Sequence, residues 1–184
     1  IVPEEMTCIN LGDTTIEINN EIAWLIGLFY ADGCLIGRNS KNLDGSVKGI
    51  HFTFSLSENH LYLKVCEILS RYFSEYFSEI RLYTGMYKGN PSCLQVSVKK
   101  SKRLAEIFVN NGIVKYKKLP PGILDAKLDI FNSFVEGFVD GDGYRHGKYT
   151  EVHINDDELM TDLSVAMTKR NIKHCVRRGK HSQN

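Results

Sequence analysis

The sequence lacks the features that would place it in a membrane or outside the cell. No apolar run is long enough to span a bilayer, and no signal-peptide pattern opens the chain. The five cysteines form no CxxC pair and accompany no histidine cluster at zinc spacing. They are Cys8, Cys34, Cys66, Cys93 and Cys175. We therefore expect a soluble intracellular protein with reduced thiols and with neither a disulfide framework nor a structural zinc.

A strong excess of basic charge is also missing, because the formal net charge of the 184 residues is only +1. The distribution of charge is more informative than its sum. Residues 86–118 contain eight lysines and arginines against one acid, Glu106, and six basic residues against no acid follow from Lys169 onward. Such clustering predicts one basic face and one acidic face, but ordinary solvated surface would give the same pattern. Charge alone therefore identifies no partner.

Hydrophobic periodicity predicts an internal duplication of mixed helices and strands. With 42% hydrophobic residues the chain can bury a core as one domain or as two small lobes. We expect the order helix, two strands, helix, strand twice, after an irregular lead-in. Helices are expected over 21–31, 57–72, 101–112, 129–141 and 156–170, and strands over 35–37, 51–56, 80–84, 92–98 and 172–178, with a hairpin over 144–155. The second copy lacks a last strand and helix, so the duplication is expected to be incomplete.

Both copies contain a helix that ends in aspartate followed by glycine. One reads GLFYADG from Gly27, and the other reads GFVDGDG from Gly137. A small residue follows each of these glycines four positions later, at Ala31 and Gly141. Because glycine inside a helix costs about 1 kcal/mol against alanine, its presence in both copies predicts that the two helices pack closely on each other there. The alternative is that each glycine faces a bulky neighbour in its own lobe.

The aspartates that end these helices, Asp32 and Asp142, stand where the helix dipole disfavours a carboxylate. If the helices pair about a pseudo-twofold axis, the two carboxylates come together. Such a pair suits a divalent cation, because Mg²⁺ prefers one or two carboxylates together with substrate phosphate oxygens. Either stretch alone would be read as an ordinary turn. The two together favour a metal site.

These stretches resemble the LAGLIDADG homing endonuclease family. Residues 25–33 (LIGLFYADG) match the nine-letter motif once, and residues 135–143 (VEGFVDGDG) match it again. The spacing of the motifs and the order of elements between them resemble the family over residues 20–178. The runs KKLPPGIL and VHINDDELMTDLSVAM resemble its intein-associated branch. Tyr30 departs from the usual motif, which we expect to affect packing more than chemistry.

The resemblance implies an α+β fold, a pseudo-twofold saddle of two αββαββα halves whose antiparallel sheets lie on DNA. Residues 1–19 would be a lead-in segment, 20–118 the first repeat and 119–184 the second, apparently truncated repeat, in a monomer. The resemblance also implies a double-strand cut at a long DNA target, as in homing of an intein or intron. Asp32 and Asp142 would bind Mg²⁺ or another divalent cation, with a backbone ligand near Ala31 left open.

Further site residues follow from the same resemblance. Lys99 is the candidate for a lysine that the family often has near the metal, and Glu58 occupies the position of a polar residue that organises water. Both could also be ordinary surface residues. The base-reading groups expected on the strands are His51, Thr53, Ser55, Arg81, Tyr83, Gln95, Ser97, His153 and Asn155. The cations expected to contact phosphate are Lys88, Lys100, Lys102 and Arg103.

Two other functions fit the same resemblance, namely a DNA-binding protein that has lost cleavage and an RNA maturase. An intein splicing element is disfavoured, because Ile1 is not the required Cys or Ser and the ending HSQN lacks the usual His-Asn pair. If the chain comes from an intein, we expect it to be the endonuclease part. No second lysine equivalent to Lys99 is found in the shorter second copy.

Overall fold

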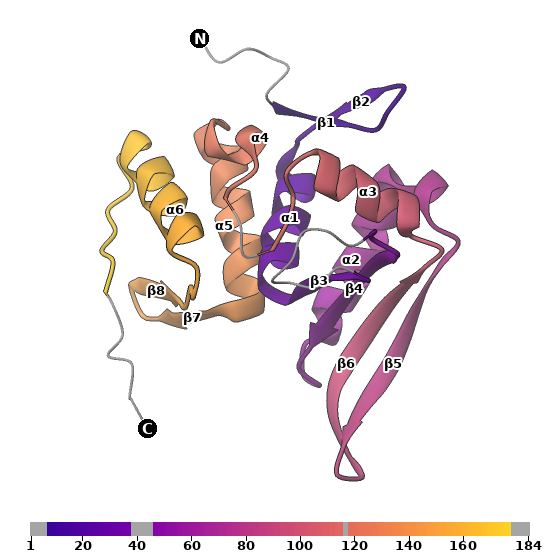
Figure 1. Cartoon of the computed structure of the whole chain (residues 1–184). Coiled ribbons are helices and arrows are strands. Elements are labelled where there is room, and N and C mark those ends of the chain that lie inside the picture. The colour runs from indigo at the N-terminus through magenta and orange to yellow at the C-terminus, as the bar shows by residue number, and fades with distance from the viewer. Residues whose placement is uncertain (1–6, 38–45, 116–117, 178–184) are drawn as a thin grey trace.

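Two long helices carry the two motifs and lie side by side at the centre of the molecule (Figure 1). The structure is a computed structural model of the whole chain, and it describes residues 7–37, 46–115 and 118–177. Helix α1 (Asn20–Asp32) belongs to the first half, and helix α5 (Leu128–Asp142) belongs to the second. The remaining helices and three antiparallel sheets flank this pair. The expected mixed α+β class is confirmed.

The first half has the complete αββαββα order. Its strands form one antiparallel sheet in the order β3-β4-β6-β5, and the long β5–β6 hairpin extends from the body of the molecule (Figure 1). After α1 come β3 (Gly33–Ile36), β4 (Gly49–Phe54), α2 (Asn59–Tyr72), the short 3-10 helix η2 (Ser74–Tyr76), β5 (Glu79–Tyr87), β6 (Asn90–Lys99) and α3 (Lys102–Asn110). Alternation of buried and exposed residues along β3 and β4 explains why one face of the sheet packs inward.

The second half is shorter among the described residues. Helix α5 is followed by β7 (Gly143–His146), β8 (Tyr149–Val152) and α6 (Asp157–Lys169), and β7 and β8 pair only with each other. The strand expected over 172–178 is not formed in its described part, residues 172–177. This segment instead returns toward α6, where His174 Nε2 lies 2.8 Å from Ser164 Oγ.

Three local features differ from the elements expected from the sequence. The lead-in contains a hairpin of β1 (Cys8–Asn10) and β2 (Thr15–Glu17), which Asn111 ties to the first half through hydrogen bonds with both backbone groups of Asn10. A short helix α4 (Pro121–Leu124) begins at the proline pair, since proline suits the first helical turn. The helix expected over 57–72 begins only at Asn59, because Glu58 holds the cap position and its carboxylate accepts from the Ser55 N–H at 2.7 Å.

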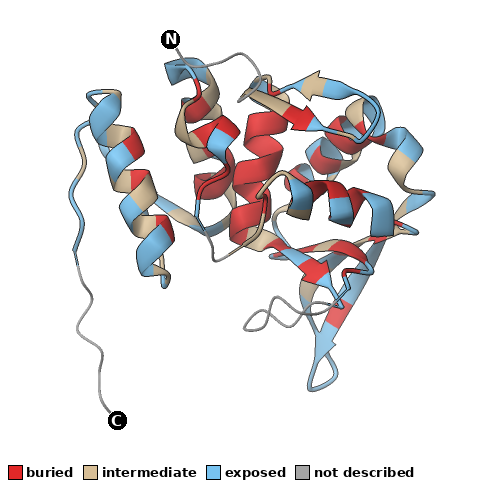
Figure 2. Ribbon diagram, turned by 45° about the horizontal axis from the view of Figure 1, so that its top comes forward, coloured by how far each residue is buried: buried red, intermediate tan, exposed pale blue. Residues whose placement is uncertain are grey.

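Helix α1 forms the centre of the hydrophobic core. Every residue from Ile22 to Ala31 is buried, and Figure 2 shows this helix as an almost continuous buried ribbon. A helix that is apolar on all sides needs neighbours all round, and α1 has α5 on one side and the four-stranded sheet, α2 and α3 on the others. None of the helices in the described residues is long and apolar enough to cross a membrane.

Candidate functional site

The two motif helices touch through their glycines. A Cβ on Gly27 would overlap the carbonyl oxygen of Phe134 in α5, and a Cβ on Gly137 would overlap the carbonyl oxygen of Trp24 in α1. The obstacle is backbone in both cases, so no side-chain rearrangement could make room. The expected close packing of the two helices is therefore confirmed, and the reciprocal contacts show the pseudo-twofold relation of the two motifs. The contact brings the C-terminal ends of both helices together.

Asp32 ends α1 in a partly buried position. Its Oδ2 atom is buried and has no hydrogen-bond partner among the described residues. Burial, the nearby carboxylate of Asp142 and then that of Glu58 raise the pKa of Asp32 to about 7, while the charge of Lys115 lowers it. An unpartnered buried carboxylate oxygen is costly unless a proton or a cation accompanies it. The first motif therefore supplies a carboxylate that is ready for a positive partner.

Asp142 ends α5 in an exposed position. The glycine before it keeps the two carboxylates close, because a Cβ on Gly141 would lie 2.6 Å from Asp32 Oδ2 and would overlap the Cβ of Ala31. This contact explains why the second motif has GDG where the first has ADG. The structure thus brings Asp32 and Asp142 together as the motifs predicted, in unequal environments.

Lys115 is the basic residue at this site, and the reasoning from sequence missed it. It follows α3, in the segment that returns toward α5, and its Nζ donates to the carbonyl oxygen of Ala31 at the end of α1. The predicted lysine, Lys99, lies opposite Glu79 at the end of β6 with its Nζ 5.3 Å from the centre of the Tyr83 ring. The available signal was topological, since a segment that connects α3 to α5 can pass the ends of the motif helices.

Glu58 lies close enough to Asp32 for its charge to raise the pKa of that carboxyl group. Its carboxylate is already engaged by the Ser55 N–H, which fixes the turn between β4 and α2. Among the described residues no group of three or more His, Cys, Asp or Glu side chains is placed to hold a metal ion. A cation at the helix ends would thus depend on the two aspartates together with other oxygens, from the backbone or from outside the chain.

Six of the predicted base-reading residues lie on one face of the four-stranded sheet. The strand register aligns them in two neighbouring rows across β4, β6 and β5. One row consists of His51, Ser97 and Arg81, and the next consists of Thr53, Gln95 and Tyr83. Directly paired residues of antiparallel strands point to the same face. The register therefore gathers these side chains on the face opposite the core.

The other predicted contact residues are more dispersed. Ser55 follows β4, with its Oγ 3.0 Å from that of Ser57, whereas His153 and Asn155 follow β8 in the second half. Lys88 lies in the turn of the β5–β6 hairpin, and Lys100 lies between β6 and α3. At the start of α3, Lys102 lies 3.7 Å from Glu106 and Arg103 lies over the Tyr76 ring. Their contacts with nucleic acid remain predictions.

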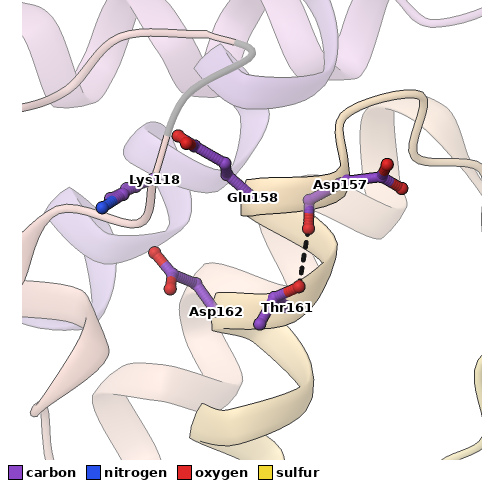
Figure 3. Close-up of a pocket in the computed structure, with 5 residues that line it drawn as sticks. All are labelled: Lys118, Asp157, Glu158, Thr161 and Asp162. Atoms are coloured by element: carbon purple, nitrogen blue, oxygen red, sulfur yellow. Dashed lines mark hydrogen bonds between the residues drawn. The ribbon is translucent and has the colours of Figure 1, made fainter.

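A separate hollow of about 350 Å³ lies between the segment before α4 and the start of α6 (Figure 3). Lys118 faces the side of α6 that carries Glu158 and Asp162, while Asp157 points away. Asp162 accepts a hydrogen bond from the Leu119 N–H at 3.0 Å, so this carboxylate attaches the connecting segment to α6. None of the predicted site residues lines this hollow. We interpret it as a packing gap where the connecting segment lies against α6.

Comparison with known proteins agrees with the architecture. No protein-family profile matches the sequence, and no curated protein does. Solved structures of the homing endonuclease I-DmoI match it. The structure of I-DmoI in complex with DNA and Mn has 17% sequence identity and a TM-score of 0.62, covering 90% of this chain and 85% of that one. Mesophilic variants of I-DmoI give 16%, 0.60 and the same coverages.

I-DmoI in complex with DNA and Ca is a further match, with 16% identity and a TM-score of 0.54 over 84% of this chain and 73% of that one. At these identities the likeness establishes the fold and nothing about chemistry. The chain therefore has the LAGLIDADG homing endonuclease fold.

Proposed function

We propose that this protein is a sequence-specific DNA endonuclease that makes a double-strand cut with the help of a divalent cation. The observation that carries this proposal is the unpartnered, buried Oδ2 atom of Asp32, next to Asp142 and Lys115 at the paired helix ends. A buried carboxylate oxygen without a partner is rare in folded proteins and marks a site with an unfilled chemical role. The likeness in fold to a homing endonuclease in complex with DNA supports duplex DNA as the substrate.

The residues present fit a hard divalent cation. Asp32 and Asp142 would hold it, and their oxygen donors suit Mg²⁺, which we propose as the natural ion. A bound divalent cation stabilises negative charge on a phosphoryl group and lowers the pKa of water. The protein's own residues would do the rest. Lys115 offers a fixed positive charge beside the phosphate, and Glu58 fixes the backbone turn next to Asp32.

Binding of duplex DNA would use the exposed face of the β3-β4-β6-β5 sheet. Its two rows of polar side chains supply donors and acceptors for base edges in the major groove. Lys88, Lys100, Lys102 and Arg103 would contribute contacts to phosphate, which set affinity and its dependence on salt. We further propose that the chain acts as a monomer in the homing of an intein or intron, since both motifs lie in one chain and the runs at KKLPPGIL and VHINDDEL resemble intein-associated members.

The test is cleavage of a plasmid library with randomised inserts in Mg²⁺, with Mn²⁺ as a second ion. We expect linear product from the wild type and none from Asp32→Asn or Asp142→Asn. Asp129→Asn is a matched control, because this exposed aspartate lies in the first turn of the same helix, α5. Cleavage that survives both motif substitutions would refute the site, and a chain that neither binds nor cuts any library member would refute the function.

One observation favours a second candidate, a DNA-binding protein that does not cut both strands. Asp142 is exposed, and the second half has only the two-stranded β7–β8 sheet among its described residues. The same library distinguishes the two candidates. Sequence-selective binding without metal-dependent cleavage would support the binding protein, and nicked circles would show that only one half is active.

A further inference from the structure

The polar face of the four-stranded sheet contains a hollow of about 340 Å³. It lies beside the two rows of polar residues and the last residue of β3. Strands β4, β5 and β6 and the end of β3 therefore contribute to it. The residues that line it are Ile36, His51, Tyr83, Gln95, Val96 and Ser97. It is therefore a formed depression on the face that would lie against DNA.

The hollow contains no fixed charge. None of its six lining residues is an acid, a lysine or an arginine, and burial together with the charge of Lys115 lowers the pKa of His51, which favours the neutral imidazole. Two cations beside the hollow, Arg81 and Lys99, already have partners on β5. Arg81 forms an ion pair with Glu79 at 2.5 Å, and Lys99 lies over the Tyr83 ring. Phosphates bind to cations, so this hollow suits a base edge instead.

Building on the proposed function, we propose that this hollow reads a single A·T base pair in the major groove, with Gln95 on the adenine and Ile36 against the thymine methyl group. A glutamine amide offers one acceptor and one donor, which match the N6 amino group and the N7 atom of adenine. Guanine presents two acceptors at the same positions and is matched by Arg or Lys, which the lining lacks.

The backbone of Gln95 is fixed by the strands on both sides of it. It pairs with Thr53 on one side and with Tyr83 on the other, in the middle of the sheet. Gly85 makes room for the amide, because a Cβ at that position would lie 3.2 Å from Gln95 Nε2 and would overlap Cys93 Sγ. Any larger residue at position 85 would push against the Gln95 side chain. Gly85 therefore leaves the space in which the Gln95 amide lies.

The apolar part of the hollow accounts for the thymine. Ile36 is 36% exposed at the end of β3, where it places an apolar side chain beside the polar rows. The C5-methyl group of thymine is the apolar feature of the major groove. The Tyr83 ring, 41% exposed, supplies a second apolar surface. Ile36 and Tyr83 together would favour an A·T pair over a G·C pair through contact with the methyl group, without further hydrogen bonds.

The test is selection of binding sites from a randomised duplex library with the full chain in Ca²⁺. We expect the wild type to fix A·T at one position at least 10-fold over the other pairs. Gln95→Ala should lose most of this preference, a change of roughly 10- to 100-fold at that position alone. Gln95→Glu should move the preference to C·G, since a carboxylate accepts from the cytosine amino group. Lys102→Ala, a control, should weaken all sequences alike.

A second measurement isolates the methyl group. Replacing the thymine by deoxyuridine at that position should weaken binding of the wild type several-fold and should not weaken binding of Ile36→Ala further. If the selected site is unchanged in both Gln95 variants, the assignment of the hollow is wrong while the proposed function stands. If the wild type selects no sequence at all, the proposed function fails and the base-pair assignment fails with it.

Discussion

The two halves of the molecule carry the same motif in different surroundings. In the first half, α1 is buried on every side beneath a four-stranded sheet, and Asp32 at its end has a buried oxygen atom. In the second half, α5 buries one face, a two-stranded sheet follows it, and Asp142 is exposed. Gly27 and Gly137 nevertheless make mirrored contacts. The motif thus determines where the backbones meet, whereas the rest of each half determines how deeply each carboxylate is buried.

The helix contact should be equally sensitive from both sides. Gly137→Ala should destabilise the fold by about 3 kcal/mol or more, because the new methyl group meets the backbone carbonyl of Trp24 and cannot be accommodated by a rotamer change. Thermal unfolding followed by circular dichroism measures this, and Gly27→Ala should match it. Gly147→Ala is the control. Nothing lies within 4 Å of its Cβ, so only its φ of 57° should cost about 1 kcal/mol.

Lys115, which supplies positive charge at the site, belongs to the first half of the molecule. Lys115→Met should slow cleavage of a selected target about 100-fold, because one preorganised charge beside the reacting phosphate is lost. Lys99→Met should leave the rate of the chemical step near that of wild type, since Lys99 lies over Tyr83. Single-turnover kinetics at saturating DNA makes the comparison. A larger loss for Lys99→Met would support Lys99, the lysine expected from the sequence, as the catalytic one.

The unequal burial of the aspartates predicts unequal pH dependence of stability without metal. The pKa of Asp32 is about 7 in the folded state against an ordinary value of 3.8. Between these values the folded state retains a proton that the unfolded state has lost, so the free energy of unfolding should fall as pH rises from about 4 to about 7. It should then level off. The shift alone corresponds to about 4 kcal/mol, and screening by solvent at this partly exposed group should reduce the loss to on the order of 2 kcal/mol.

Urea unfolding in EDTA at several pH values tests this dependence. Asp32→Asn should remove most of the slope and should stabilise the protein at pH 7.5. Asp142→Asn should retain part of the slope, because it removes the repulsion between the carboxylates but not the larger effect of burial. Equal effects of the two substitutions would contradict the difference between the halves.

The smallest expected effect concerns a bond that joins the halves. The indole N–H of Trp24 donates to Asp140 Oδ2 at 2.8 Å, and Arg145 donates to Oδ1 of the same carboxylate at 2.7 Å. Trp24→Phe should cost about 1 kcal/mol, since Asp140 keeps Arg145 as its partner. Urea unfolding followed by circular dichroism measures the change. A loss above about 3 kcal/mol would mean that the indole contributes mainly through packing.

Much of the central architecture could be predicted from the sequence, because glycine and aspartate have few alternative explanations when they recur at one spacing. Gly27 and Gly137 predicted the helix contact, and alternating residues such as His51 and Phe52 predicted which face of β4 points outward. These features depend on local periodicity. They remain readable even when neighbouring elements are unknown.

Features that depend on distant contacts could not be predicted. Lys115 belongs to a connection whose path is set by the whole first half, and no local pattern distinguishes it from Lys99 or other lysines nearby. The β1–β2 hairpin forms against Asn111, which lies 101 residues from Asn10 in the sequence. The strand expected after α6 had a suitable pattern, but its described residues, 172–177, pair with no strand. In each case tertiary contacts, not local preference, determined the outcome.

Tyr30 shows how the first motif depends on the connection between the halves. It is buried, and its hydroxyl group donates to the Lys118 carbonyl oxygen at 2.8 Å, with the Gly112 carbonyl oxygen at 3.3 Å. Both acceptors lie in the segment that leaves the first half, so a change in the length of this segment would leave the phenol without a fixed acceptor inside the core. An insertion in this connection would therefore be better tolerated with phenylalanine than with tyrosine at position 30.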